Sequence, residues 1–313
     1  MTTERTRTRG RPREERRFIV AFLTPAFVLF TVFVAVPSIR ALAYSLQKWD
    51  GFSKPQWVGL ENFARLFRES DLFAVAFAHN AFLMIVGGSL VLGLSLFFAA
   101  ALHRRVRGAR LFRVAFFFPN VISSVAVSLL WLLLYSTTRF GVINSIAMWI
   151  DAWGQWCGID LIPVELPFAF LDSKHLIYSI IPMIVWSGTG FYMVLFLAAM
   201  EAIPESYYEV AKLEGASAFA QFRHITLPLI REVLAVGTVF LVIGSLKFFD
   251  AIWILENQWP TRDSHVLATL LYQKVFSEYN VGYGSAVAVL LFILVFAATF
   301  VTLKLSRREA VEY

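Results

Sequence analysis

The pattern of apolar positions divides the chain into six long hydrophobic runs separated by shorter polar segments. A helix needs about 20 apolar residues to cross a hydrocarbon layer roughly 30 Å thick, and each run reaches that length. The pattern therefore predicts an all-α, polytopic membrane protein with six transmembrane helices. The fifth run is the weakest, because Arg231 and Glu232 lie near its start and must reach the interface. The predicted spans are 18–39, 80–102, 114–135, 177–200, 227–246 and 283–303.

The polar segment after the first span has local structure of its own. Asp50 and Gly51 form a turn signal. Segment 59–68 has the apolar spacing of a short amphipathic helix, and helices of this kind commonly lie in the plane of the interface. The apolar positions of this helix are Leu60, Phe63, Leu66 and Phe67.

Composition supports lipid as the solvent of much of the chain. Apolar residues make up 58% and charged residues 16% of the sequence, against roughly 45–50% and about 25% in soluble proteins. A soluble globule could not cover that much apolar surface with polar groups, so the composition excludes a soluble enzyme and a disordered regulator. The single cysteine, Cys157, also excludes an internal disulfide.

The distribution of basic residues predicts the topology. Seven arginines lie in 1–17 and five in 103–113, next to predicted spans. With both termini cytoplasmic, 18 of the 28 Lys and Arg fall in inside segments and 10 in the longer outside segments, as the positive-inside rule requires. The chain then consists of a basic cytoplasmic tail (1–17), a transmembrane domain (18–303) and a cytoplasmic tail (304–313).

Two alternatives exist for the N-terminal region. A nucleic-acid-binding arm is disfavoured, because no aromatic side chain is interleaved with the arginines. A cleavable signal peptide is disfavoured because the apolar run is longer than a usual h-region, and because Pro37 and Arg40 interrupt the approach to the small residues 41–43. A retained membrane anchor, with no nucleic-acid partner, is the better interpretation.

The sequence lacks the motifs of an energy-converting site. It contains no G-x-x-x-x-G-K-[S/T] phosphate loop, no H-E-x-x-H pair and no C-x-x-C pair, and no two of its five histidines have i, i+4 spacing. No predicted span carries a central row of charged residues of the kind that proton-driven carriers use as relays. We therefore expect no enzyme activity, metal or cofactor in this chain. A channel, a structural protein and a pathway powered by another subunit remain open.

The polar segment between spans four and five has the clearest helix signals. Ser206 and Glu209 have the spacing of a capping box, which predicts a helix starting directly after Ser206. Gly215 stands where a left-handed residue would end that helix. A second short helix is expected at 218–224, and Pro228 is expected in the first turn of span five. On these signals alone, Glu209 and Gly215 could have purely local structural roles.

Together these residues resemble a known motif. Segment 201–228, with Glu209-Val210-Ala211 followed by Gly215, looks like the EAA loop of permease subunits of ABC importers, although Val210 replaces the first alanine. In that family the loop is a coupling helix that docks into a cleft of the cytoplasmic ATPase. The resemblance implies that Glu209 faces a basic group of the ATPase. The residues implied in coupling are Glu209, Ala211, Gly215, Ala216, Leu227 and Pro228.

The resemblance extends over most of the chain. Segments 37–46, 57–63 and 140–144 are similar to permeases of sugar importers of the maltose/glycerol-phosphate type, as are 272–276 and the Gly282-Tyr283 pair. Gln258-Trp259-Pro260 stands where a Gly-Gly-Pro often precedes the last span.

What the resemblance implies is an ABC-importer type I permease fold in a bacterial or archaeal cell (inner) membrane. The implied partners are a second permease subunit, two ATPase subunits that bind ATP and Mg, an extracytoplasmic solute-binding protein and membrane lipid. A different solute, such as a glycerol phosphate ester, and a stand-alone secondary carrier are the alternatives.

Small and polar residues inside the spans are candidates for a solute pathway. In span four they interrupt an apolar run about midway, and in span five they lie near the outer end. Hydroxyl and backbone groups can hydrogen-bond a sugar while an aromatic ring covers its apolar face, but close helix packing would use the same small residues. The candidates are Trp186, Ser187, Gly188, Thr189, Gly190, Tyr192, Ser245, Phe248 and Asp250.

Overall fold

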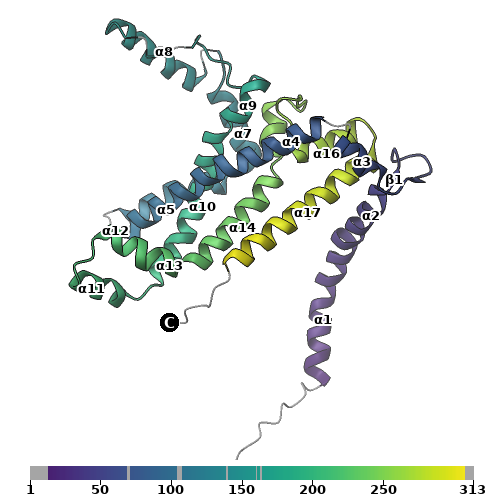
Figure 1. Cartoon of the computed structure of the whole chain (residues 1–313), viewed down its shortest axis with the longest axis horizontal. Coiled ribbons are helices and arrows are strands. Elements are labelled where there is room, and N and C mark those ends of the chain that lie inside the picture. The colour runs from purple at the N-terminus through teal and green to yellow at the C-terminus, as the bar shows by residue number, and fades with distance from the viewer. Residues whose placement is uncertain are drawn as a thin grey trace, which may run out of the picture.

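The computed structural model of the chain describes residues 13–68, 71–103, 108–138, 140–159, 161–162 and 164–306. Most of the predicted tails 1–17 and 304–313 lies outside these ranges. The described chain is a bundle of long helices with shorter helices at both ends (Figure 1).

The long helices confirm that the predicted spans are helical, with bounds that differ from the predicted ones. Within the described residues, five continuous helical segments are long and apolar enough to cross a membrane, and a sixth segment is a bent pair of helices. Several contain a π-helical turn, labelled η. The segments consist of α1 (Arg13–Phe30), η1 (Thr31–Ala35) and α2 (Val36–Ser45); α4 (Asp71–Phe82), η2 (Leu83–Gly87) and α5 (Gly88–His103); α6 (Ala109–Val121) and α7 (Ser124–Leu134); α9 (Ser173–Ser179) and α10 (Ile181–Glu201); α14 (Arg231–Leu246) and α15 (Asp250–Leu255); and α17 (Val281–Ser306).

Span three is not the single helix that the sequence predicted. α6 and α7 meet at an angle of 97°. The backbone of Ile122 is extended (φ −72°, ψ 141°), and the next residue, Ser123, caps α7 by accepting a hydrogen bond from the N–H of Ala126 at 3.3 Å. A hydrophobicity window does not detect such a break, because the residues on both sides of it are apolar.

Span five also differs from its predicted bounds, 227–246. A short helix, α13 (Leu227–Leu229), contains Pro228, and the backbone of Ile230 leaves the helical region before α14 begins at Arg231. At the other end the helix breaks at Lys247–Phe249 and continues as α15. Pro228 therefore precedes the span instead of lying in its first turn.

The first span contacts the bundle through α2, which packs against α17, whereas α1 stands apart (Figure 1). None of its most apolar stretch is buried within the described chain. Phe22 and Phe33, for example, are 75% and 72% exposed. The surface of this helix is therefore available to lipid and to other subunits.

Spans two, three and five pack around α10, which contacts α5, α6 and α14, and α17 packs on α14. Met193, Phe196 and Met200 of α10 are fully buried and pack with Ala99 and Ile230 in one apolar cluster. Such close packing makes this part of α10 sensitive to added side-chain volume.

The end of the bundle near the start of α17 carries a small hairpin and several short helices. The predicted amphipathic helix is present as α3 (Glu61–Arg68), in which Leu66 is buried against α17 and Phe67 is exposed; Leu60, directly before the helix, is also exposed. One face of α3 thus packs on protein. The remaining elements here are the antiparallel strands β1 (Gln47–Lys48) and β2 (Gln56–Trp57), and the helices α3 (Glu61–Arg68), α16 (Leu267–Tyr272) and η4 (Gln273–Ser277).

The turn predicted at Asp50-Gly51 joins β1 to β2. A carboxylate oxygen of Asp50 accepts hydrogen bonds from the N–H groups of Phe52 and Ser53 at 2.9 and 2.7 Å, and Gly51 has a φ of +94°. These hydrogen bonds lower the pKa of Asp50 to about 2, so its carboxylate is ionised at neutral pH. The turn signal is confirmed.

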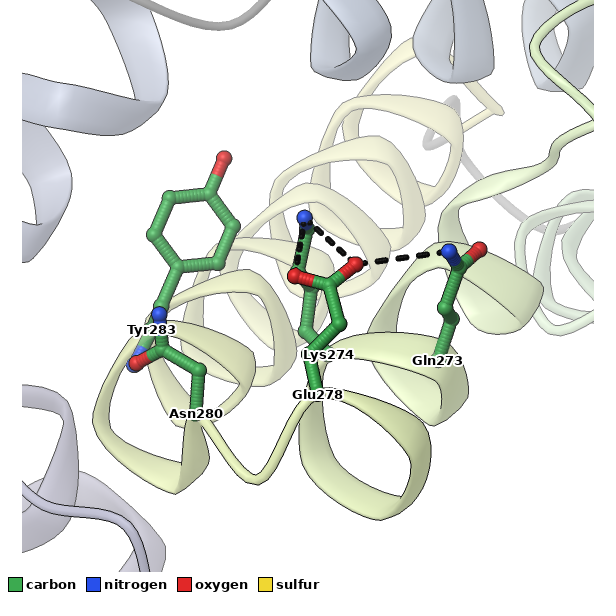
Figure 2. Close-up of polar contacts among 5 residues, drawn as sticks. All are labelled: Gln273, Lys274, Glu278, Asn280 and Tyr283. Atoms are coloured by element: carbon green, nitrogen blue, oxygen red, sulfur yellow. Dashed lines mark hydrogen bonds and ion pairs between the residues drawn. The ribbon is translucent and has the colours of Figure 1, made fainter.

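A polar cluster fixes the corner between η4 and α17 (Figure 2). Lys274 donates to both carboxylate oxygens of Glu278, at 2.8 and 2.7 Å, and Gln273 donates to the same group at 3.3 Å. The side chain of Asn280 accepts from the N–H of Tyr283 at 3.3 Å, and the ammonium of Lys274 lies 5.8 Å from the centre of the Tyr283 ring. These contacts join η4 to the first turn of α17.

Candidate functional site: a surface loop and a cavity at two helix breaks

The segment between α10 and α14 forms a folded loop at one end of the bundle (Figure 1). Its first helix, α11 (Glu205–Leu213), begins two residues earlier than predicted. Pro204 is the N-cap residue, and no side chain caps this helix, so the predicted Ser206–Glu209 capping box is wrong. The fixed φ of Pro204 and the negative charge of Glu205 in the first turn favour a helix start here without a side-chain cap.

The end of α11 is as the sequence predicted. Gly215 has a φ of +77°. Its N–H donates to the carbonyl of Lys212 at 3.0 Å, and the N–H of Ala216 donates to the carbonyl of Ala211 at 2.8 Å. These two bonds form a Schellman motif, which requires a left-handed residue between them.

A second short helix, α12 (Ala218–Gln221), follows at once, as predicted. Ser217 caps it by accepting from the N–H of Ala220 at 3.2 Å, and a π-helical turn, η3 (Phe222–Thr226), continues it to α13. The sequence analysis missed this cap, although a serine two residues after Gly215 and directly before 218–224 is a standard signal for one.

The loop presents an exposed surface with both apolar and charged groups. No residue of α11 is buried. Val210, Leu213 and Phe219 are 59%, 88% and 70% exposed, and Glu209 is also exposed. Exposed apolar side chains rimmed by charges are typical of a protein docking surface. The predicted coupling residues are thus brought together in one loop, with Leu227 and Pro228 at its far end.

One contact stabilises the loop internally, and a second lies at its junction with the spans. The hydroxyl groups of Tyr208 and Thr226 are 2.9 Å apart and join α11 to η3. Arg113 of α6 forms a salt bridge with Glu201 at the end of α10. A cavity of about 1610 Å³ lies between these elements and α5. The salt bridge therefore joins α6 to the residue of α10 from which the loop starts.

A second cavity, of about 580 Å³, lies deeper in the bundle, where the two broken helices face each other. Ser124 at the start of α7 donates a hydrogen bond to Asp250 at the start of α15, so the two breaks are directly linked. Backbone outside regular helices is tolerated at membrane depth where it lines a cavity. Six predicted pathway residues line this cavity: Ser187, Gly188, Tyr192, Ser245, Phe248 and Asp250.

The other three predicted pathway residues do not line it. Trp186 packs edge-on against Trp131, with ring centres 6.2 Å apart. Thr189 is 4% exposed, and its carbonyl accepts a hydrogen bond from Ser95 at 2.8 Å. Gly190 lies so close to α6 that a Cβ there would be 1.9 Å from the carbonyl oxygen of Phe116. These three residues occupy helix contacts.

Several lining residues were not singled out from the sequence. Asn120 and Lys247 lie at the two helix breaks, and Ser128 comes from α7. Lys247 is exposed within the spanning run Arg231–Leu255, and an ionisable group at such a position is a functional candidate. These residues are recognised as candidates only once the structure shows where the helices break. The described residues contain no group of three or more His, Cys, Asp or Glu side chains placed to hold a metal ion.

Comparison with known proteins gives the family. The sequence model of the family described as "Binding-protein-dependent transport system inner membrane component" matches residues 91–310, which include the loop and both helix breaks. The chain belongs to this family. The resemblance seen in the loop sequence is therefore confirmed, and a multi-pass membrane location follows from the family and from the apolar helices.

Individual relatives cover nearly the whole chain. It is 31% identical to the diacetylchitobiose uptake system permease protein NgcF of Streptomyces coelicolor, over 92% of this chain and 84% of the relative. It is also 31% identical to the trehalose/maltose transport system permease protein MalF of Thermococcus litoralis, over 91% and 92%.

A solved structure shares the fold. The crystal structure of a bacterial alginate ABC transporter, in complex with a periplasmic protein bound to an alginate pentasaccharide, contains a chain that matches with a TM-score of 0.76. The match has 23% identity and covers 94% of this chain and 96% of that one. The predicted ABC-importer permease fold is thus confirmed.

Proposed function

We propose that this chain is a permease subunit of an ABC importer, and that it forms with a second permease the pathway for a sugar or oligosaccharide. An extracytoplasmic binding protein delivers the solute, and two separate ATPase subunits bind ATP and Mg. The cavity between the two linked helix breaks is the observation that carries this proposal within the family. The named solutes of the relatives, diacetylchitobiose and trehalose/maltose, support a sugar.

The chemistry of the cavity suits a sugar. Ser187, Ser245 and Asn120 offer hydroxyl and amide groups, while Tyr192 and Phe248 offer aromatic rings. Hydroxyl groups of a sugar need donors and acceptors, and the C–H face of the ring packs on aromatic carbon. The volume of 580 Å³ is within the usual range for small-molecule sites.

The loop provides a route for coupling. In this proposal α11 and its end at Gly215 dock into the ATPase on the cytoplasmic side, where the basic residues of the chain are concentrated, with Glu209 facing a basic group. Closure of the ATPase dimer moves α11 as a rigid body. The Tyr208–Thr226 and Arg113–Glu201 contacts pass the displacement to α6, α10 and the segment before α14. Helices α6, α10 and α14 line the cavity, so its walls move with the loop.

Reconstitution tests the assembly and the substrate class together. The chain is solubilised gently, its co-purifying proteins are identified, and the complex is assayed in proteoliposomes with candidate binding proteins and labelled disaccharides. We expect an ATPase and a second permease to co-purify, and uptake to require ATP and a binding protein. Uptake by this chain alone would contradict the proposal. ATP-dependent uptake of a glycerol phosphate ester without sugar uptake would show that the solute is a phosphate ester and not a sugar.

Filling the cavity should block uptake without disturbing the assembly. Ser187 lines the cavity, and in the variant Ser187→Phe an added ring would occupy part of the 580 Å³. We expect sugar uptake in proteoliposomes to be lost while binding of the ATPase persists. The matched control is Ala297→Phe, which adds the same ring at an exposed position of α17 outside the cavity. Equal loss of uptake in both variants would count against a pathway through the cavity.

A further inference from the structure

Helix α8 (Val142–Trp156) projects from the bundle beyond the end of α7 (Figure 1). Its first turn is anchored by the fully buried side chain of Asn144. The amide of Asn144 donates to the carbonyl of Ser136 at 3.1 Å and to that of Phe168 at 3.0 Å, and its oxygen accepts from the N–H of Phe168 at 2.8 Å. Ser136 lies two residues beyond the end of α7. The start of α8 is therefore held where the broken span ends.

One face of α8 is apolar, aromatic and uncovered. Its residues are spaced i, i+4, i+7, i+11 and i+14, which places them in one stripe along the helix. Each side chain in this stripe is between 49% and 83% exposed. We call these residues the tryptophan stripe: Val142, Ile146, Trp149, Trp153 and Trp156.

The opposite face of α8 carries buried and polar residues. Asn144 and Gly154 are buried there against the segment that follows the helix, with Gly154 next to Ile159 and Leu161. Asp151 accepts a hydrogen bond from Gln155 at 2.8 Å. Asp151 is the one charged residue of the helix, which contains no Lys or Arg. The side opposite the stripe thus carries the buried contacts of Asn144 and Gly154 together with the polar side chains of Asp151 and Gln155, of which Gln155 is exposed.

We propose that α8 lies in the interface of the bilayer, with the tryptophan stripe inserted among the lipids. Tryptophan is enriched at this boundary because its ring is apolar while its N–H needs a polar partner. A helix of 15 residues is about 22 Å long, which is too short to cross the hydrocarbon layer. Its anchor to Ser136 holds it at the end of a span. Because α10 crosses the bundle between them, this interface is on the opposite side from α11.

Helix α8 contains no basic residue, and this determines which lipids it should bind. Insertion then depends on burial of apolar area and not on attraction to anionic headgroups. Vesicles of phosphatidylcholine, which carry no net charge, are therefore the appropriate membrane. The adjacent Cys157 is the only cysteine of the chain, so its replacement by serine gives a cysteine-free background.

Spin labels on the two faces test the proposal in the full chain. In the Cys157→Ser background, Trp153→Cys places a nitroxide on the stripe, and Gln155→Cys places one on the opposite, exposed face. Ile146→Cys is a second stripe variant that keeps all three tryptophans. Collision rates with oxygen, which concentrates in lipid, and with a water-soluble nickel complex are measured after reconstitution into phosphatidylcholine vesicles.

We expect the oxygen-to-nickel collision ratio at positions 146 and 153 to be several-fold higher than at 155. Similar, water-like ratios at all three positions would overturn the proposal. Shielding of the stripe labels from both reagents would also overturn it, because it would show that a protein surface covers the stripe instead of lipid.

Discussion

The variant Gly215→Val is expected to lower uptake about tenfold while leaving the chain in the membrane at its normal level. Gly215 has a φ of +77°, and no atom lies within 4 Å of the position that a Cβ would take, so the effect arises from the backbone alone. A residue with a Cβ in this conformation costs roughly 1–2 kcal/mol, which corresponds to about a 5- to 30-fold smaller population of the docking conformation. The measurement is uptake in proteoliposomes, normalised to the amount of protein.

The control for this prediction is Gly215→Asn. Asparagine tolerates the left-handed conformation far better than a β-branched residue, so this variant should retain most of the uptake. ATP hydrolysis should persist in both variants, because the altered residue belongs to the permease. If the asparagine variant fails as severely as the valine variant, the side chain itself disturbs the docking surface and the backbone explanation is wrong.

The variant Gly190→Ala is expected to destabilise the protein by about 3 kcal/mol, at the upper end of the usual cost of overpacking. A Cβ at residue 190 would lie 1.9 Å from the carbonyl oxygen of Phe116 and 2.8 Å from the Cα of Phe117. These are backbone atoms, so no change of rotamer relieves the contact, and α10 must move away from α6. Thermal unfolding of the detergent-solubilised chain measures the effect.

Gly188→Ala is the matched control, two residues earlier in α10. Its Cβ would meet the methyl groups of Val91 at 3.3 and 3.5 Å, and these side-chain atoms can shift. We expect a small change in stability there. The comparison also separates two roles for the small residues of span four, a solute pathway and close helix packing. Gly188 lines the cavity, whereas Gly190 does not. Equal destabilisation by both variants would contradict this division.

The features that the sequence predicted correctly depend on short-range signals. Spans follow from the length of apolar runs, and the end of α11 follows from a glycine after a helical pattern. The start of α11 was wrong because two short-range signals compete there: Ser206 fits a capping box, but Pro204 fixes the backbone two residues earlier. Local rules do not decide between such signals.

The cavity could be predicted only in part, because it depends on contacts between distant segments. Nothing within 114–135 indicates that Ser124 meets Asp250 or that the two breaks line one cavity. Ser187 and Gly190 have similar sequence contexts, yet one faces the cavity and the other faces α6. Their orientations are set by which neighbouring helix approaches each side of α10, and this information lies outside span four.

The contact between Ser124 and Asp250 also has a consequence for the synthesis of the protein. The two residues are 126 positions apart. At about 5–20 residues per second, the ribosome adds Asp250 roughly 6–25 s after Ser124. During that interval the newly inserted α6 and α7 have an open break in the membrane and no partner for it. We infer that the cavity closes late in biogenesis, when the fifth span enters and covers the break.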